Sequence, residues 1–279
     1  MAFASFILFA LLLLQVFIYQ SSFLFNFTSK WTALENDHKT VVTPKPKEDQ
    51  DGHPSLDPSL NVFFKVTDLH IGKTMPIYFA SDRDSTPTRL LSRSEADSIP
   101  FSSSKLPYLL EFFSFSNTSP QARAMETTLK QCELKPTGGE VKFCVTSLES
   151  MLDMTRHFFG TVKPKVLTTK ILSSNHTLFQ NYTFVERPLE MHASKVVACH
   201  TMAYPYLVYY CHGHKGHLTR VFKIALFGEN KERVEAAAVC HMDTSTWDGD
   251  HVAFRVLGGH PGSSPVCHVL PVDNVVWFA

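Results

Sequence analysis

Residues 195–215 read KVVACHTMAYPYLVYYCHGHK and contain two Cys-His dipeptides separated by ten residues. The runs that precede the dipeptides are rich in Val, Ala and Tyr, and the β-branched and aromatic residues among them favour β-strands. The pattern continues downstream, and the full set is Cys199-His200, Cys211-His212, Cys240-His241 and Cys267-His268. With 14 histidines among 279 residues, six cysteines would give only about 0.3 such dipeptides by chance. The dipeptides therefore organise the C-terminal third of the chain.

The intervals between the dipeptides are 10, 27 and 25 residues, and they match no zinc-finger pattern. Because neighbouring side chains of a strand point to opposite faces, one face can carry cysteines in disulfides while the other presents imidazoles. The disulfides would fix the strand ends, and the imidazoles would gather as candidate metal ligands: His200, His212, His241 and His268. Imidazole nitrogen suits copper or zinc, and copper is bound more tightly by a given nitrogen site. Alternatively, the disulfides are purely structural and the histidines fill half-buried polar positions.

The six cysteines are an even number and suit an oxidising compartment. Cys132 and Cys144 bracket the segment ELKPTGGEVKF, and we expect them to form a local disulfide. Six cysteines allow fifteen pairings, so the sequence leaves the connectivity of the other four open. The cysteines expected in disulfides are Cys132, Cys144, Cys199, Cys211, Cys240 and Cys267.

Two more polar groups flank the dipeptides. His214 and His217 in CHGHKGH are either a loop metal site or a solvated turn. The segment DTSTWDGDH adds Asp243, Asp248, Asp250 and His251. These residues either orient the imidazoles or cap turns. The sequence contains no nucleophile elbow, phosphate-binding glycine loop or His-Glu-x-x-His motif. A Cys-His protease dyad is disfavoured, because its two partners meet in space and not as sequence neighbours.

The first twenty residues, MAFASFILFALLLLQVFIYQ, are uncharged and almost wholly apolar. They predict a signal peptide over residues 1–22 and entry into the secretory pathway. An uncleaved anchor is the alternative, because an apolar run of roughly 17–19 residues approaches the length that spans a bilayer. Once the signal is cleaved, we expect no membrane segment.

Residues 23–59 predict a disordered linker, because they are rich in Pro, Asp and Lys and lack an apolar period. Asn-x-Ser/Thr sequons predict glycosylation at Asn26, Asn117, Asn175 and Asn181. Acidic and basic residues balance at 26 each, so no global field would recruit nucleic acid.

Folded sequence is expected over residues 60–279, beginning with strands at 61–72 and 75–80. Residues 102–115 have helical character, and Ser119 before Pro120 predicts a helix to about Lys130. Thr146 or Ser147 caps a further helix that ends before Gly160. We expect the apolar stripe of this helix to lie in the core, and it comprises Leu148, Met151, Leu152, Phe158 and Phe159.

From Lys165 onward, short runs rich in Val, Tyr and Phe predict strands, including HVAFRVL at 251–257. Helices followed by strands favour the α+β class. The predicted fold is a helical N-terminal layer packed on a β-rich C-terminal half and stapled by disulfides.

The spacing CH-x10-CH-x27-CH-x25-CH resembles the signature of the plant BURP domain. The blocks FFKVTDLHIGKTM, LSRSEADSIPFSSSKL, ETTLKQCE and GEVKFCVTSLESM resemble other recurring parts of that family. The likeness covers roughly residues 60–279. The short linker and the segments MAYPYLVYYCHGHKGH and AVCHMDTSTWDGDHVAF look most like the unknown-seed-protein branch.

This resemblance implies two kinds of function. Some BURP proteins are copper-dependent peptide cyclases, which join a Tyr or Trp side chain to another atom of a peptide. Their Cys-His histidines ligate copper, which implies copper ligands here at His200, His212, His241 and His268. Other members are seed or cell-wall proteins, associated with protein storage vacuoles or the apoplast.

Three hypotheses follow for this chain. The first is a secreted or vacuolar protein of the seed-protein-like type, acting in development or stress, with a copper site on a stapled fold. The second is a copper-dependent cyclase acting on a separate peptide, because the linker has no repeated peptide and Trp31 is its only aromatic residue. The third is a non-catalytic module that binds cell-wall components.

Overall fold

The structure is a computed structural model that describes residues 62–79, 89–136, 139–173, 176–216 and 218–279. The predicted signal peptide, the linker and the sequons at Asn26 and Asn175 lie outside these residues.

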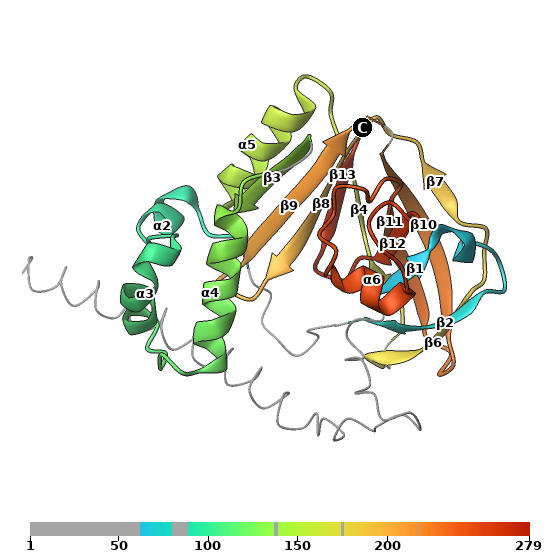
Figure 1. The fold of residues 1–279 in the computed structure, drawn as a ribbon, viewed down its shortest axis with the longest axis horizontal. Helices are drawn as coiled ribbons and strands as arrows, with labels where there is room; N and C mark the ends of the chain where they lie inside the picture. The colour runs from blue at the N-terminus through green and yellow to red at the C-terminus, as the bar shows by residue number, and fades with distance from the viewer. Residues whose placement is uncertain (1–61, 80–88, 137–138, 174–175, 217) are drawn as a thin grey trace, which may run out of the picture.

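Two antiparallel sheets form the framework (Figure 1). The larger sheet has eight strands and runs in the order β1-β12-β11-β10-β6-β2, with β5 paired to β11 and β7 paired to β10. Its strands are β1 (Phe63–Lys65), β2 (Thr74–Tyr78), β5 (Lys170–Ile171), β6 (Phe179–Phe184), β7 (Leu189–Met191), β10 (Thr219–Gly228), β11 (Arg233–His241) and β12 (Val266–Val269). The smaller sheet has five strands in the order β3-β9-β8-β13-β4. Its strands are β3 (Glu140–Val145), β4 (Lys165–Thr168), β8 (Lys195–Met202), β9 (Val208–Lys215) and β13 (Val275–Phe278).

The helices gather mainly on one side of the smaller sheet, near β3 and β9 (Figure 1). They are α2 (Arg93–Asp97), α3 (Leu106–Phe112), α4 (Pro120–Glu133), α5 (Leu148–Phe159) and the short α6 (Val252–Leu257), with 3-10 turns at Val66–Asp68 and Ser103–Lys105. In the described part of the chain, no helix is both long and apolar enough to cross a bilayer.

Helix starts follow the predicted capping residues. The Ser119 side chain accepts a hydrogen bond from the Ala122 N–H, with Pro120 at the first helical position of α4. The Ser147 side chain accepts from the Ser150 N–H at the start of α5, and Gly160 with φ 67° ends that helix. Both starts satisfy N–H groups that have no partner within the helix, so local sequence fixes where these helices begin.

Strand alternation sorts the apolar residues into three layers. Val196, Val239 and Val276 lie in a cluster shared by the two sheets. Cys199 packs with α5 residues on the outer face of the smaller sheet. Cys240 packs in the core on the opposite face of the larger sheet. Because positions two apart share a face, the histidine after each cysteine lies on the side where the sheets meet.

Two local predictions were wrong. Residues 252–257 form α6 and not a strand, and the adjacent residues Ala253 and Phe254 are both buried, as a helix allows and an alternating strand does not. In α5, Leu148 and Leu152 are 54% and 41% exposed, whereas the other three members of the predicted stripe are buried. Leu148 and Leu152 lie four residues apart and share a helix face, and that face points to solvent.

The chain is therefore a mixed, strand-rich fold with three disulfides. The finer prediction of a helical N-terminal layer on a β half is not confirmed. The strands β1 and β2 precede the helices yet belong to the larger sheet, and β3 lies between α4 and α5 in the chain. Long-range strand pairing decides this order, and short sequence windows do not report it.

Replacing Tyr206 with Phe is expected to stabilise the protein. The buried hydroxyl of Tyr206 has no hydrogen-bond partner among the described residues. Removing it should raise the free energy of unfolding by about 1 kcal/mol, measured by urea denaturation. Tyr209→Phe is the matched control, because the Tyr209 hydroxyl donates to the Asp273 carbonyl at 3.1 Å and its loss should cost about 1 kcal/mol. Equal destabilisation by both variants would contradict this account.

Candidate metal centre

Two disulfides join strands that lie side by side. Cys199 and Cys211 are register partners in β8 and β9, and a disulfide links them. Cys240 and Cys267 are register partners in β11 and β12 and are linked in the same way. All four cysteines are fully buried. Each sheet therefore carries one cross-strand staple directly beside its two histidines.

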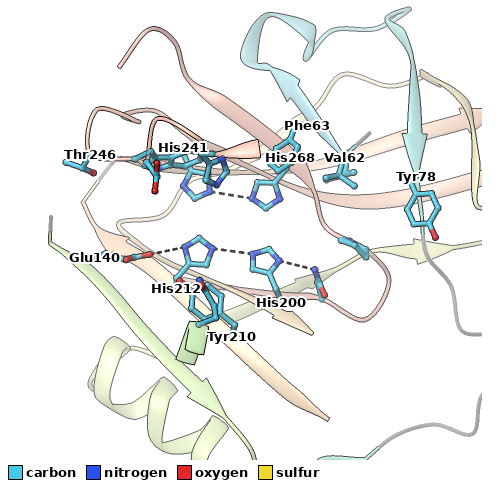
Figure 2. A pocket seen from close by; sticks show the side chains of 17 residues that line it. Val62, Phe63, Tyr78, Glu140, His200, Tyr210, His212, His241, Thr246 and His268 are labelled. Atoms are coloured by element: carbon cyan, nitrogen blue, oxygen red, sulfur yellow. Dashed lines mark hydrogen bonds and ion pairs between the residues drawn. The ribbon is translucent and has the colours of Figure 1, made fainter. Parts of the chain in front are cut away.

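The staples place the imidazoles on the facing sides of the two sheets. Figure 2 shows His200 and His212 on one sheet opposite His241 and His268 on the other. The Nε2 atoms of His200 and His212 lie 3.3 Å apart, and those of His241 and His268 lie 3.4 Å apart. The structure thus brings all four predicted histidines together as two pairs.

The four rings form a closed circuit of neighbours. Ring centroids lie 5.3 Å apart for His200–His212, 5.7 Å for His212–His241, 5.5 Å for His241–His268 and 5.5 Å for His268–His200. We call these four residues the imidazole cluster. Its members come from four strands of two sheets, so only the tertiary fold assembles it.

Burial keeps rings of the cluster neutral. Burial, with a smaller contribution from the nearby His212, lowers the pKa of His268 to about 4, while a backbone hydrogen bond at Val269 opposes the shift. Burial also lowers the pKa of His200 well below its usual value, with further contributions from His212 and His268. Neutral imidazole is the form that binds metal ions, so the electrostatics favour ligation.

Polar partners extend from one pair of the cluster. The Nδ1 atom of His212 lies 3.4 Å from a carboxylate oxygen of Glu140 on β3. The Nδ1 atom of His200 lies 3.0 Å from the side-chain nitrogen of Asn274, which directly precedes β13. A carboxylate beside a ring nitrogen is the usual support for a metal-binding histidine. Sequence reasoning missed Glu140 and Asn274, because strand order alone brings them beside the dipeptides.

A cavity of about 540 Å³ opens on the imidazole cluster. Aromatic side chains form much of its wall, namely Phe63, Tyr78, Tyr210 and Trp247. Tyr210 stacks on His212 with ring centroids 5.3 Å apart, and Trp247 meets His241 edge-on at 5.0 Å. The lining also holds the carboxylates of Glu140 and Asp248, and no Lys or Arg from the described residues. The cavity therefore suits aromatic groups that are neutral or positively charged.

The other predicted polar groups divide between turn caps and the cavity wall. Asp243 and Asp248 accept hydrogen bonds from the N–H groups of Ser245 and Asp250, as turn caps do. His251 lines the cavity and stacks near Trp247 at 4.4 Å, but its Nδ1 accepts from the Ala253 N–H at the start of α6. Asp250 is exposed, and its backbone N–H donates to the carboxylate of Asp248.

The remaining predicted positions are on β9, in the third disulfide, at the sequons or outside the described residues. His214 belongs to β9, and His217 lies outside the described residues. Cys132 and Cys144 form a third disulfide between α4 and β3. Of the two described sequons, Asn117 is exposed in a turn, whereas Asn181 is half-buried in β6 and donates to Glu229 at 2.8 Å. Glycosylation at all four sites stays a prediction.

The donor set fits a copper or zinc ion in chemistry and in local spacing. Two nitrogens that share a tetrahedral ion at about 2.0–2.1 Å are separated by about 3.3–3.4 Å. The two Nε2 separations within the cluster, 3.3 and 3.4 Å, agree with that value. Within the part of the chain that the structure describes, however, no three His, Cys, Asp or Glu side chains already converge as a ligand set. The two pairs would have to approach one another to share one ion.

The fold and the site together define a class of protein: two antiparallel sheets, each stapled beside a pair of Cys-His dipeptides, with imidazoles gathered between the sheets. The model of the BURP domain family matches residues 62–279. The chain therefore belongs to the BURP domain family.

Relatives match between 80% and 89% of the chain. The BURP domain protein USPL1 of Arabidopsis thaliana is 46% identical over 261 residues, which cover 89% of this chain and 93% of that protein. The BURP domain-containing protein BNM2A of Brassica napus is 49% identical and covers 80% of this chain and 81% of its own length. The BURP domain protein RD22 of Arabidopsis thaliana is 40% identical, covering 80% of this chain and 57% of that protein. These likenesses support a plant protein of the USP-like branch, and the three disulfides are consistent with the secretory pathway.

Proposed function

We propose that this chain is a secretory-pathway copper protein in which the imidazole cluster holds the ion. It would act in plant development, in seeds or in the response to stress, after export to the protein storage vacuole or the cell wall. The observation that carries this proposal is the pairing of Nε2 atoms at 3.3 Å between the partly buried rings of His200 and His212 and at 3.4 Å between the buried rings of His241 and His268. An all-imidazole donor set favours copper over the other divalent ions of the first transition row.

A second candidate function is oxidative crosslinking of a separate peptide. The cavity beside the cluster supports it, because about 540 Å³ of space with aromatic walls can receive a Tyr or Trp side chain. Copper would supply the one-electron chemistry that such a bond requires. Phe63 and Trp247 would hold the incoming ring against the cluster, and the two sheets would exclude water from the reacting groups.

Metal analysis of the mature protein, purified from a secretory host, tests the first function. We expect bound copper, and we expect His241→Ala to weaken copper binding by about tenfold or more, measured by competition titration. His260→Ala is the matched control, because this exposed histidine bonds its neighbour Pro261 outside the cavity. Loss of affinity in both variants, or in neither, would contradict the site assignment.

Peptide turnover separates the candidates from each other. The copper-loaded protein would be incubated in air with peptides that contain Tyr or Trp. A mass decrease of two daltons per peptide supports the crosslinking enzyme, because two hydrogens leave when the new bond forms and dioxygen accepts the electrons. Bound copper without turnover leaves the first function standing. No copper after reconstitution favours a wall-binding module instead.

A further inference from the structure

His176 and Glu232 form a buried pair apart from the imidazole cluster. His176 lies in the connection between β5 and β6, and Glu232 directly precedes β11; their side chains are 6% and 0% exposed. Nδ1 of His176 lies 2.6 Å from Oε1 of Glu232. Nε2 of the same ring lies 2.8 Å from the carbonyl oxygen of Phe79, which directly follows β2. The sequence separations are 56 and 97 residues, so one ring joins three distant segments.

The partners of the ring decide how many protons the pair holds. The Phe79 carbonyl oxygen can only accept, so Nε2 of His176 must donate. The separation of 2.6 Å between Nδ1 and Oε1 is that of a hydrogen bond, so a second proton lies between these two atoms. That proton belongs either to the imidazole or to the carboxyl group of Glu232.

The donors around the other oxygen of Glu232 assign the second proton to the ring. Oε2 accepts from the Thr177 N–H at 3.1 Å and from the side-chain amide of Gln180 at 3.0 Å. The orientation of this amide is fixed, because its oxygen accepts from the Asn230 N–H at 3.0 Å. Hydrogen bonds donated to a carboxylate favour its charged form. His176 is therefore an imidazolium with a proton on each nitrogen, paired with an ionised Glu232.

The surroundings of the pair supply no second countercharge. Among the described residues, Glu232 has no ion-pair partner other than His176. From β6, Tyr182 faces Glu232; burial and the Glu232 charge raise the pKa of this phenol to about 12, so it is neutral at neutral pH. From β2, the contact is the uncharged carbonyl of Phe79. The chain neighbour Lys231 is exposed.

The pair also holds one wall of the cavity that opens on the imidazole cluster. Tyr78, the last residue of β2, lines that cavity (Figure 2). The next residue, Phe79, accepts from the His176 ring and donates its N–H to the Leu178 carbonyl at 2.8 Å. Both contacts anchor the end of β2 to the segment that contains His176, so they fix the backbone beside Tyr78.

We propose that His176 and Glu232 form a pH-responsive clamp on this cavity wall. While the ring has both protons, it bonds Glu232 and Phe79 together. A neutral ring can donate to only one of these two acceptors, and its formation leaves a buried carboxylate without a countercharge. The clamp is therefore closed in an acidic compartment and loosens as the pH rises. It involves no copper, so its test is independent of the proposed function.

Nitrogen-15 NMR of metal-free protein counts the ring protons directly. At pH 7.5 an ordinary histidine is mainly neutral, whereas we expect both nitrogens of His176 to be protonated. The resonances are assigned by their absence from His176→Gln. In Glu232→Gln, the amide group can donate to Nδ1 and its oxygen can accept from Thr177, so the contacts remain while the countercharge is lost. The ring of that variant should have only its Nε2 proton. One proton on the wild-type ring, or two in Glu232→Gln, would overturn the proposal.

Amide hydrogen exchange tests the effect on the cavity wall. Opening that releases one proton gains up to about tenfold per pH unit. Between pH 6 and pH 8.5, the protection of the Phe79 and Thr177 amides should therefore fall by about tenfold or more, after correction for intrinsic exchange rates. In Glu232→Gln the change should be less than about twofold. The Gly160 amide, which donates to the Arg156 carbonyl at the end of α5, is the internal control and should not change. Equal falls in wild type and Glu232→Gln, or an equal fall at Gly160, would contradict a local clamp.

Discussion

Replacing both Cys240 and Cys267 with Ala is expected to cost about 3.5 kcal/mol of folding stability and to disperse the imidazole cluster. The crosslink closes a loop with a sequence separation of 27 residues, and the chain-entropy model gives about 3.5 kcal/mol for a loop of that length. The same bond fixes the strand ends that carry His241 and His268. Urea denaturation would report the stability, and copper titration would report the cluster.

The disulfide between Cys132 and Cys144 provides the matched control. Its separation of 12 residues predicts a loss of about 3 kcal/mol when both cysteines become Ala. It joins α4 to β3. Neither cysteine belongs to a Cys-His dipeptide, and Cys144 is register-paired with Tyr210. We therefore expect this variant to lose stability but to keep its copper affinity. If both double variants lost copper equally, the staples would act only through global stability and not by positioning the rings.

The dipeptides themselves explain why sequence could predict much of the site. Alternation in a strand requires Cys199 and His200 to face opposite sides, and the structure places Cys199 in the outer core and His200 between the sheets. Cys240 and His241 likewise face opposite sides of the larger sheet, with Cys240 in its core and His241 beside His212. Because the rule is local, it predicts the face of each side chain without knowledge of which strands are neighbours.

What sequence could not predict depends on pairing between distant segments. The Cys240–Cys267 pair requires β12 to return beside β11 after a segment that contains α6. Glu140 reaches His212 because β3 pairs with β9, and Asn274 reaches His200 because β13 pairs with β8. The two side-chain contacts with the histidines join residues more than 60 positions apart, such as His200 and Asn274 with a separation of 74. Local composition carries no signal of such contacts.

Metal-free protein is expected to lose roughly 3 kcal/mol of stability between pH 7 and pH 4 through His268 alone. Burial lowers the pKa of His268 from 6.5 to about 4 in the folded protein. Between these values the unfolded chain binds a proton that the folded chain does not, so stability is complete above about pH 6.5 and falls as the pH falls toward 4. A difference of 2.5 pKa units integrates to roughly 3 kcal/mol by pH 4. The groups that face this ring are chiefly other histidines, with His212 and His251 both opposing its protonation.

Urea denaturation in the presence of a chelator at pH 7, 5.5 and 4 measures this dependence. His268→Gln should reduce the loss in that range and leave the part that comes from buried His200, whereas His260→Gln, which changes an exposed ring, should leave the loss intact. Carboxylates act in a different window. Hydrogen bonds from Arg89 and Ser92 lower the pKa of Glu95 to about 2. The stability that Glu95 contributes is therefore lost only as the pH falls below about 4.5. Saturating copper should steepen the dependence, because the copper-bound folded protein binds still fewer protons at these ring nitrogens than the unfolded chain does. An unchanged slope in His268→Gln would show that His268 is not the group whose burial opposes protonation.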